Sequence, residues 1–210
     1  MRKYKHIIFD IDGTLIDTEE AILQSLQDTV HEILHKDIEK SELRFALGIP
    51  GSMTLRTLGI TDTEHANSRW NEHLLKYKSI RLFDGIPQLL GNLKMNGYQL
   101  GIVTSKTRNE YTTDFAVPFA LSDYFCTVIC VEDTLRPKPF PEPLLSYLNA
   151  SHINAENAIY IGDTIYDSQC AQKAGVDFGF AAWGNAATQG VQADYLFKRP
   201  ADIPFFLIKS

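Results

Sequence analysis

Short, almost continuously apolar runs recur along the chain and alternate with segments of helical spacing. The apolar runs fall at residues 6–9, 99–104, 127–131, 158–161 and 178–181, with a weaker one at 195–197. The segments of helical spacing between them lie at residues 86–96, 108–115, 142–148 and 168–174. Continuous apolar runs are typical of strands that are buried on both faces of a parallel sheet. The alternation therefore predicts an α/β fold with a doubly wound parallel sheet.

Residues 19–80 differ from the rest of the chain because they show helical patterns and no convincing strand. In residues 19–34 the apolar positions recur at helical spacing, and we expect Thr18 to provide the N-cap. Further helices are expected at residues 42–47, with Ser41 as the cap, and at 53–58 and 63–77. We predict a small helical domain at residues 18–82, inserted into a main domain of residues 1–17 and 83–210.

The composition narrows the class of protein. The chain has 210 residues, of which 44% are hydrophobic and 22% charged, and these are ordinary globular values. The net charge of −6 argues against a general binder of nucleic acids or anionic membranes. Cys126, Cys130 and Cys170 form neither a disulfide framework nor a zinc motif, so we expect reduced, mostly buried thiols. No apolar run reaches the length of a signal-peptide core or a membrane span, and we expect a cytoplasmic protein.

Candidate chemistry lies just beyond the apolar runs. In a doubly wound sheet, ligands bind beyond the carboxyl ends of the strands. The polar residues found at these places are Asp10, Asp12, Thr104, Ser105, Lys106, Lys138, Asp163 and Asp167. Four carboxylates, a pair of hydroxyl groups and a lysine, Lys138, are therefore expected to meet at one edge of the sheet, with Lys106 as a further candidate.

Such a cluster of carboxylates requires positive charge. Two carboxylates about 4 Å apart repel by roughly 4 kcal/mol at an effective dielectric constant near 20. Lys138 supplies one positive charge, and a divalent ion would supply the rest. Carboxylate, carbonyl and water oxygens suit Mg²⁺ better than zinc or copper. Mg²⁺, Lys138 and the Thr104 hydroxyl could together hold the oxygens of a phosphate group.

The carboxylates can then be given separate roles. Asp10 stands at the end of its strand and is the natural nucleophile, which would form an aspartyl-phosphate. Asp12 is expected to act as general acid and base, and its backbone carbonyl would join the Asp10 side chain in holding the ion. Asp163 is predicted to be a direct metal ligand. Asp167 is predicted to bind the ion through water or to orient its neighbours.

Other residues are candidates for substrate binding. Gly13, Ser105 and Lys106 lie next to the expected phosphate position. Arg44 and Arg56 belong to the predicted helical domain, where groups of the substrate beyond the phosphate would be recognised. The alternative for the two arginines is a solvated helix face. The histidines show no metal-ligand spacing.

Four short motifs occur in order along the chain. They are DIDGTLID at residues 10–17, Thr104, Lys138 and GDTIYD at residues 162–167. With these motifs the chain resembles the phosphohydrolases of the haloacid dehalogenase superfamily, in the branch with a small helical cap inserted after the first motif. The stretch from Trp183 to Tyr195 is similar to phosphoglycolate phosphatase-like members. The resemblance implies a Rossmann-like core, Mg²⁺ as the cofactor, and the first two aspartates as phosphorylated nucleophile and acid/base.

Several functions fit this reading. The favoured one is a Mg²⁺-dependent phosphatase acting on a small phosphomonoester such as phosphoglycolate. A sugar-phosphate mutase similar to β-phosphoglucomutase, or a pyrophosphatase, could use the same core. A signalling receiver domain also gathers aspartates, Thr or Ser, and Lys, but the long insertion and the position of Asp12 weigh against it. The expected partner is a small phosphorylated metabolite, with no nucleic acid or membrane, and the chain is expected to be a monomer or weak dimer.

Overall fold

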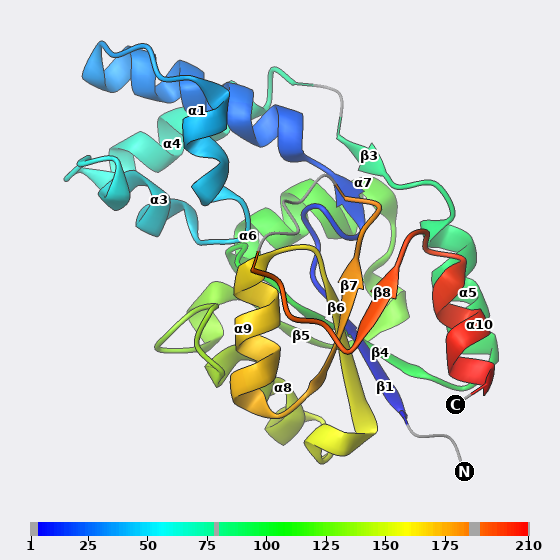
Figure 1. Ribbon diagram of the computed structural model, residues 1–210. Coiled ribbons are helices and arrows are strands. Elements are labelled where there is room, and N and C mark those ends of the chain that lie inside the picture. Colours follow the sequence, from blue (N-terminus) through cyan, green and yellow to red (C-terminus); the bar gives the residue numbers. More distant parts are fainter. Residues whose placement is uncertain (1–3, 78–79, 185–189, 210) are drawn as a thin grey trace.

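The chain folds around a six-stranded parallel sheet (Figure 1), and the computed structural model describes residues 4–77, 80–184 and 190–209. Neighbouring strands follow the order β5-β4-β1-β6-β7-β8, and every pair of neighbours is parallel. The strands are β1 (His6–Phe9), β4 (Gln99–Val103), β5 (Phe125–Ile129), β6 (Ala158–Gly162), β7 (Asp177–Ala181) and β8 (Tyr195–Phe197). This is the doubly wound order, in which the chain reverses direction across the sheet at β1. The predicted fold class is confirmed.

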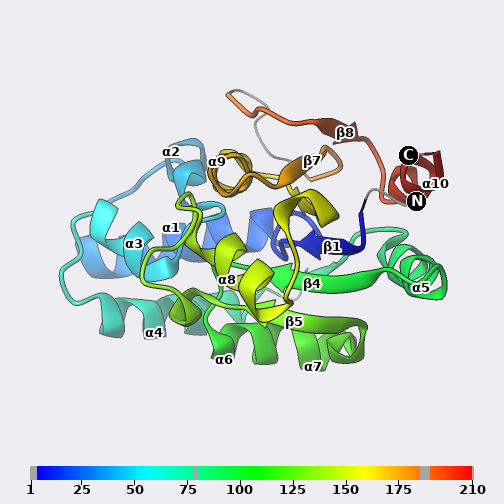
Figure 2. The same cartoon turned by 90° about the horizontal axis from the view of Figure 1, so that it is seen from below.

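Helices cover both faces of this sheet because β1 directs apolar side chains to both sides. Ile7 and Phe9 belong to one buried cluster, and Ile8 between them belongs to the other. Figure 2 shows α8 and α9 on one side of the sheet and α5 and α10 on the other. Their bounds are α5 (Ile86–Met95), α8 (Glu142–Ala150), α9 (Ile165–Ala174) and α10 (Asp202–Lys209). The carboxyl ends of β1, β4 and β6 are left free of these helices and carry the candidate site.

A separate group of helices lies beyond that end of the sheet (Figure 1). It contains α1 (Glu19–Leu34), α2 (Lys40–Leu43), a 3₁₀ turn (Arg44–Ala46), α3 (Gly51–Thr57) and α4 (Thr63–Leu74), which we call the cap. The cap has its own apolar cluster, and the Trp70 indole donates a hydrogen bond of 2.9 Å to Ser25 Oγ within it. Two short strands, β2 (Ile16–Asp17) and β3 (Arg81–Leu82), pair antiparallel where the chain enters and leaves this region.

Several predicted boundaries differ from the structure. Helix α1 begins at Glu19 as expected, but the Thr18 hydroxyl makes no capping bond and has no partner among the residues described. Ser41 is not a cap, because α2 already begins at Lys40 after Glu39. Strand β5 starts and ends two residues earlier than predicted. Helix α9 starts at Ile165, where Thr164 caps it, rather than at residue 168.

Other features were not predicted. β2 and β3 have two residues each, which is too short for a periodic signal. The expected helix at 108–115 is divided into α6 (Arg108–Glu110), a π-helical turn (Tyr111–Ala116) and α7 (Val117–Phe119). Further 3₁₀ turns lie at Ser122–Tyr124, Val131–Asp133 and Ala155–Asn157.

Cys126 is exposed, whereas Cys130 and Cys170 are buried as expected. In the described part of the chain, no helix combines the length and apolarity that crossing a bilayer would require.

Candidate active site

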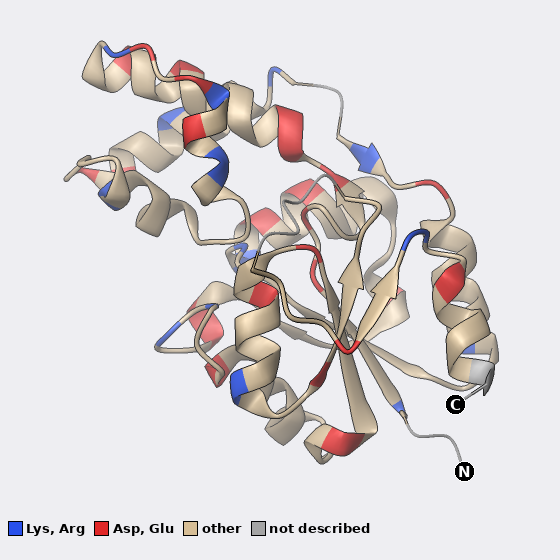
Figure 3. Ribbon diagram, in the orientation of Figure 1, with Lys and Arg blue, Asp and Glu red and all other residues tan. Residues whose placement is uncertain are grey.

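Asp10, Lys138 and Asp167 form a buried cluster of charges at the carboxyl edge of the sheet, where Figure 3 shows acidic segments in red. The Lys138 ammonium lies 2.9 Å from Asp10 Oδ1 and 2.7 Å from Asp167 Oδ1. All three residues are at most 2% exposed. β1 ends at Phe9, directly before Asp10, and α9 carries Asp167 in its first turn. Lys138 therefore joins two segments that are far apart in the sequence, and its charge is shared between two carboxylates.

Asp167 is held by a network of hydrogen bonds. Its Oδ2 accepts from the Thr164 backbone N–H at 3.0 Å and from the Thr164 hydroxyl at 2.5 Å. Its Oδ1, which accepts from Lys138, also lies 2.8 Å from the Tyr160 hydroxyl. The same hydroxyl is 3.2 Å from Lys138 Nζ and 2.9 Å from the Val103 carbonyl oxygen. With both carboxylate oxygens occupied in this way, Asp167 is well placed to orient Lys138.

Asp163 follows β6 and lies against the loop that begins at Asp10. The Thr14 hydroxyl donates a hydrogen bond of 2.9 Å to Asp163 Oδ1. Gly13 has a φ of +74°, and a Cβ atom there would lie only 2.1 Å from Asp163 Oδ2. Glycine is therefore required at position 13, both for the left-handed backbone and for the close approach of the carboxylate. Trp183 fixes the other side of the loop, since its indole N–H donates to the Thr14 carbonyl oxygen at 2.9 Å.

The charges of this cluster are not balanced by protein groups alone. Burial raises the pKa of Asp10 to about 7, although Lys138 opposes the shift. Burial, together with the nearby Asp167 and Asp10 charges, also raises the pKa of Asp163 well above its usual value. Burial lowers the pKa of Lys138, but the two carboxylates outweigh it and hold that pKa above its ordinary range. A further positive charge would relieve the repulsion among the carboxylates.

The donor set fits a divalent, oxygen-seeking ion. Asp10, Asp163 and Asp167 each offer a carboxylate oxygen, and these atoms lie within 4.8 Å of one another. Within the described residues no other group of His, Cys, Asp and Glu side chains is gathered in this way. Carboxylate oxygens favour Mg²⁺ over softer ions. The Asp12 side chain is outside this group. The expected use of its backbone carbonyl stays a prediction.

Lys106 forms a second link between carboxylates. Its ammonium lies 3.2 Å from Asp12 Oδ1 and 3.5 Å from Asp114 Oδ2. The side chain is only 11% exposed. Burial lowers the pKa of Lys106, but the charges of Asp12 and Asp114 raise this pKa by more than burial lowers it. The ammonium therefore stays charged. Asp114 belongs to the π-helical turn. Lys106 is therefore positioned beside Asp12, at the edge of the space where a substrate would lie.

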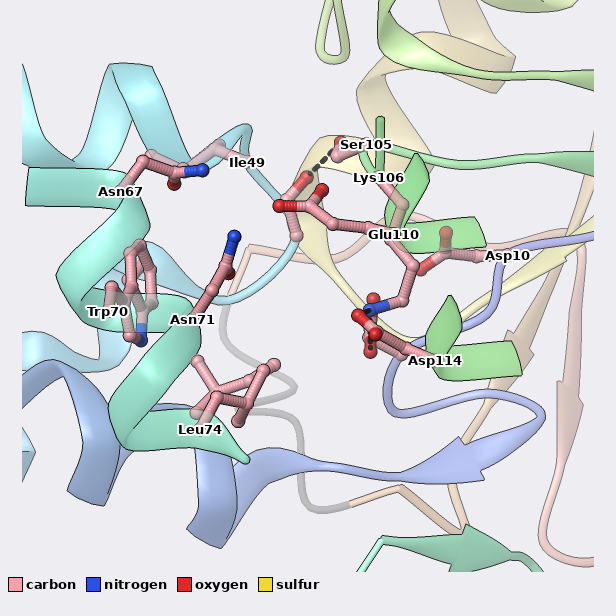
Figure 4. A pocket seen from close by; sticks show the side chains of 15 residues that line it. Asp10, Ile49, Asn67, Trp70, Asn71, Leu74, Ser105, Lys106, Glu110 and Asp114 are labelled. Carbon is pink, nitrogen blue, oxygen red and sulfur yellow. Dashed lines mark hydrogen bonds and ion pairs between the residues drawn. The ribbon is translucent and has the colours of Figure 1, made fainter. Parts of the chain in front are cut away.

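The two hydroxyl residues after β4 have different surroundings. Thr104 is buried, and its Oγ1 accepts a hydrogen bond of 3.2 Å from the Lys106 backbone N–H. Ser105 instead reaches the cap, where its hydroxyl donates to the Gly48 carbonyl oxygen at 2.7 Å (Figure 4). A second bond between core and cap runs from the Tyr166 hydroxyl to the Phe45 carbonyl oxygen, at 3.3 Å. The cap is thus closed over the candidate site.

A cavity of about 80 Å³ lies between the cap and the carboxyl edge of the sheet. One bound water occupies about 10–15 Å³ on this measure, so the space holds several waters or a small ligand. Figure 4 shows Asn67, Trp70, Asn71 and Leu74 of α4 on one side of it. On the other side the figure shows the core residues Asp10, Ser105, Lys106, Glu110 and Asp114. Asp12 also lines the cavity. The nucleophile candidate and the acid/base candidate therefore border the same cavity.

Arg44 and Arg56, which were predicted to bind the substrate, do not line this cavity. Arg44 forms an ion pair with Glu19 inside the cap. Arg56 is exposed on α3. The structure thus brings Asp10, Asp12 and Lys106 to the cavity, and places Lys138, Asp163 and Asp167 directly behind it, but it leaves these cap arginines outside.

Several site residues were missed by the sequence reasoning. Tyr160 could have been recognised from the sequence, because a hydroxyl group in an otherwise apolar buried strand needs a hydrogen-bond partner. Thr14 is part of the first motif but was given no role. Glu110, Asp114 and Asn71 gave no signal, because a polar residue on a helix is most often a solvated one. Asn71 reaches the cavity because the cap docks on the core, and Asp114 reaches it from the π-helical turn.

Comparison with known proteins supports this description. The haloacid dehalogenase-like hydrolase family matches residues 7–181 of the chain. Pyrophosphatase PpaX of Bacillus velezensis is 28% identical over 202 residues, which cover 94% of this chain and 93% of that protein. A crystal structure of a "putative phosphoglycolate phosphatase" from Lactobacillus plantarum superposes with a TM-score of 0.85 at 30% identity, covering 98% of this chain and 99% of the other. A hydrolase from Pseudomonas syringae shares the fold, with a TM-score of 0.86, 19% identity and 98% coverage of both chains.

Proposed function

Since the chain belongs to the haloacid dehalogenase-like hydrolases, we propose that it is a Mg²⁺-dependent phosphatase that hydrolyses a small phosphomonoester through an aspartyl-phosphate. The observation that carries the proposal is the placement of Asp10. It borders the cavity, and Lys138 holds its Oδ1. A carboxylate held beside a bound phosphate can attack phosphorus, which divides the transfer into two easier steps.

In the first step, Asp10 Oδ2 forms a bond to phosphorus while the bond between phosphorus and the ester oxygen breaks. Asp12 donates a proton to the leaving alcohol. In the second step Asp12 takes a proton from water, which attacks the aspartyl-phosphate and releases inorganic phosphate and free Asp10. Support for this role comes from Lys106, which lies 3.2 Å from Asp12 Oδ1 and so holds the side chain at the cavity.

The remaining residues bind and orient. Asp10, Asp163 and the Asp12 backbone carbonyl would hold the Mg²⁺ ion, and Asp167 would act through water or by orienting Lys138. When bound, the ion would neutralise charge on the phosphoryl oxygens and offset the repulsion between phosphate and carboxylates. Thr104, Lys138 and Lys106 would provide further donors to those oxygens. Ser105 has a different role in this proposal, because its hydroxyl ties the cap to the core.

Pyrophosphate hydrolysis is the second candidate. Its support is the name of the Bacillus velezensis relative, a pyrophosphatase that covers nearly the whole chain. The same aspartates could attack either phosphorus atom of pyrophosphate, with the second phosphate as leaving group. The residues at the catalytic edge do not distinguish a phosphate ester from a phosphate anhydride, so a substrate screen is required.

The test is a phosphate-release screen with the purified protein over phosphoglycolate, hexose phosphates, nucleotides and pyrophosphate, with Mg²⁺ or with EDTA. We expect steady release of phosphate from at least one phosphomonoester, loss of that activity in EDTA and its return with Mg²⁺. Release without a bisphosphate activator would also exclude a mutase. Turnover that is insensitive to chelation, or hydrolysis of pyrophosphate alone, would contradict the proposal.

A further inference from the structure

The cavity is bordered by two walls of different chemical character. The cap wall presents the uncharged amides of Asn67 and Asn71 beside the apolar surfaces of Trp70 and Leu74 (Figure 4). The core wall presents carboxylates, among them Glu110, which lies opposite Asn71 in Figure 4. Whatever part of a substrate extends beyond its phosphate must lie between these walls, so their charges decide which leaving groups fit.

On the core wall, the positive charge that lines the cavity is already paired with carboxylates and is not available to a leaving group. Lys106 is the one Lys or Arg residue that lines the cavity in the part of the chain described. Its ammonium already lies 3.2 Å from Asp12 and 3.5 Å from Asp114. Glu110 adds a further carboxylate to the same wall. Its position is fixed, because it accepts a hydrogen bond of 2.8 Å from the Thr107 backbone N–H and closes the N-terminal cap of α6.

The whole site is rich in negative charge even when a divalent ion is counted. Six carboxylates, two lysines and one divalent ion would surround the phosphate. The carboxylates are Asp10, Asp12, Glu110, Asp114, Asp163 and Asp167, and the lysines are Lys106 and Lys138. A second anionic group on the substrate would therefore lie close to uncompensated carboxylates, which would repel it.

We propose that Glu110, facing Asn71 across the cavity, selects a leaving group that is uncharged and carries hydroxyl groups, and disfavours anionic leaving groups such as glycolate or phosphate. The carboxylate accepts hydrogen bonds from hydroxyl groups, and the amides of Asn67 and Asn71 can donate or accept. Trp70 and Leu74 cover the carbon skeleton. This inference depends on the proposed phosphatase activity, and it names the class of leaving group on which that activity would act.

A matched pair of substrates isolates the charge. 2-Hydroxyethyl phosphate and 2-phosphoglycolate have nearly the same size and differ in an alcohol against a carboxylate. We expect kcat/KM to be at least about tenfold higher for 2-hydroxyethyl phosphate, and pyrophosphate to be a poor substrate. A preference for phosphoglycolate or pyrophosphate would overturn the inference while leaving phosphatase activity established. Absence of phosphate release from every compound would refute the proposed function itself.

Variants then assign the preference to Glu110. Glu110→Gln keeps the shape and the bond to Thr107 but removes the charge, and should lower the ratio of the two kcat/KM values by about three- to tenfold. Glu132→Gln is the matched control, because Glu132 also accepts a backbone N–H at the start of α6, from Arg108, but is exposed and outside the cavity. The control should leave the ratio unchanged. An unchanged ratio in Glu110→Gln would overturn the assignment.

A second variant covers the case in which Glu110→Gln does not fold. Asn71→Lys places a positive charge on the opposite wall, which is formed by α4. It should lower the ratio in the same direction, by improving phosphoglycolate hydrolysis relative to that of 2-hydroxyethyl phosphate. A ratio that stays at the wild-type value in a folded Asn71→Lys protein, as judged by circular dichroism, would contradict the proposal.

Discussion

The two sides of the cavity are built in different ways. On the core side, charged groups from distant segments are locked together, as Lys138 shows by contacting Asp10 and Asp167 within 3 Å while being 1% exposed. On the cap side, amide and apolar side chains stand on α4, and hydrogen bonds such as that between Ser105 and Gly48 connect the cap to the core. Under the proposed function, the buried charges of the core side determine the reaction, and Glu110 together with the side chains of α4 that face it determines the choice of leaving group.

The largest effect is expected from removal of the nucleophile. Asp10→Asn retains the shape of the side chain and should lower kcat by at least about 10⁴-fold, because an amide cannot form the acyl-phosphate bond. The circular dichroism spectrum should stay that of the wild type. Asp123→Asn is the control, since Asp123 is exposed and lies in the 3₁₀ turn before β5, at the amino end of the sheet, and its activity should be normal. Wild-type phosphate release by Asp10→Asn would refute the assignment.

The next effect concerns stability of the core side. Lys138→Met leaves Asp10 and Asp167 buried without their shared cation, and should cost about 3–5 kcal/mol of unfolding free energy in the presence of EDTA. Urea denaturation measures this. Lys198→Met, at an exposed lysine, should change the unfolding free energy by less than about 0.5 kcal/mol. Equal stabilities for the two variants would show that the buried ion pairs do not matter.

A dependence on pH should follow from the raised carboxylate pKa values. In the folded protein without metal, Asp10 keeps its proton up to about pH 7, whereas its ordinary pKa is 3.8. Between these values the folded state holds more protons than the unfolded state, so raising the pH destabilises the fold. In EDTA, Tm should fall by roughly 5–10 °C from pH 5 to pH 8. Mg²⁺ should reduce this fall, and an identical pH dependence with and without Mg²⁺ would contradict the metal assignment.

The smallest effect is expected at the outer face of the cap. Arg56→Ala should change kcat/KM by less than about twofold for every substrate, because Arg56 is exposed and does not line the cavity. Asn71→Ala, on the inner face of the cap, should change kcat/KM by about tenfold. Equal effects of the two substitutions would remove the distinction between the inner and outer faces of the cap.

The sequence revealed more of the core side than of the cap side. Continuous apolar strands and the rule that ligands bind at carboxyl ends were enough to predict the sheet and the meeting of Asp10, Lys138, Asp163 and Asp167. Short local features could not be predicted, such as the two-residue strands β2 and β3. The cavity residues of the cap were missed for another reason: a polar residue such as Asn71 shows no sign, in the sequence, of which surface it will face.

In the proposed mechanism, Asp10 carries the phosphoryl group and Asp12 releases it. The most direct test is intact-protein mass spectrometry of Asp12→Ala after brief incubation with Mg²⁺ and the phosphomonoester that the screen finds best. We expect a mass increase of one phosphoryl group, sensitive to hydroxylamine, on the peptide that contains Asp10, and no increase in an Asp10→Asn/Asp12→Ala double variant. A phosphorylated double variant, or phosphate bound elsewhere in the chain, would contradict it.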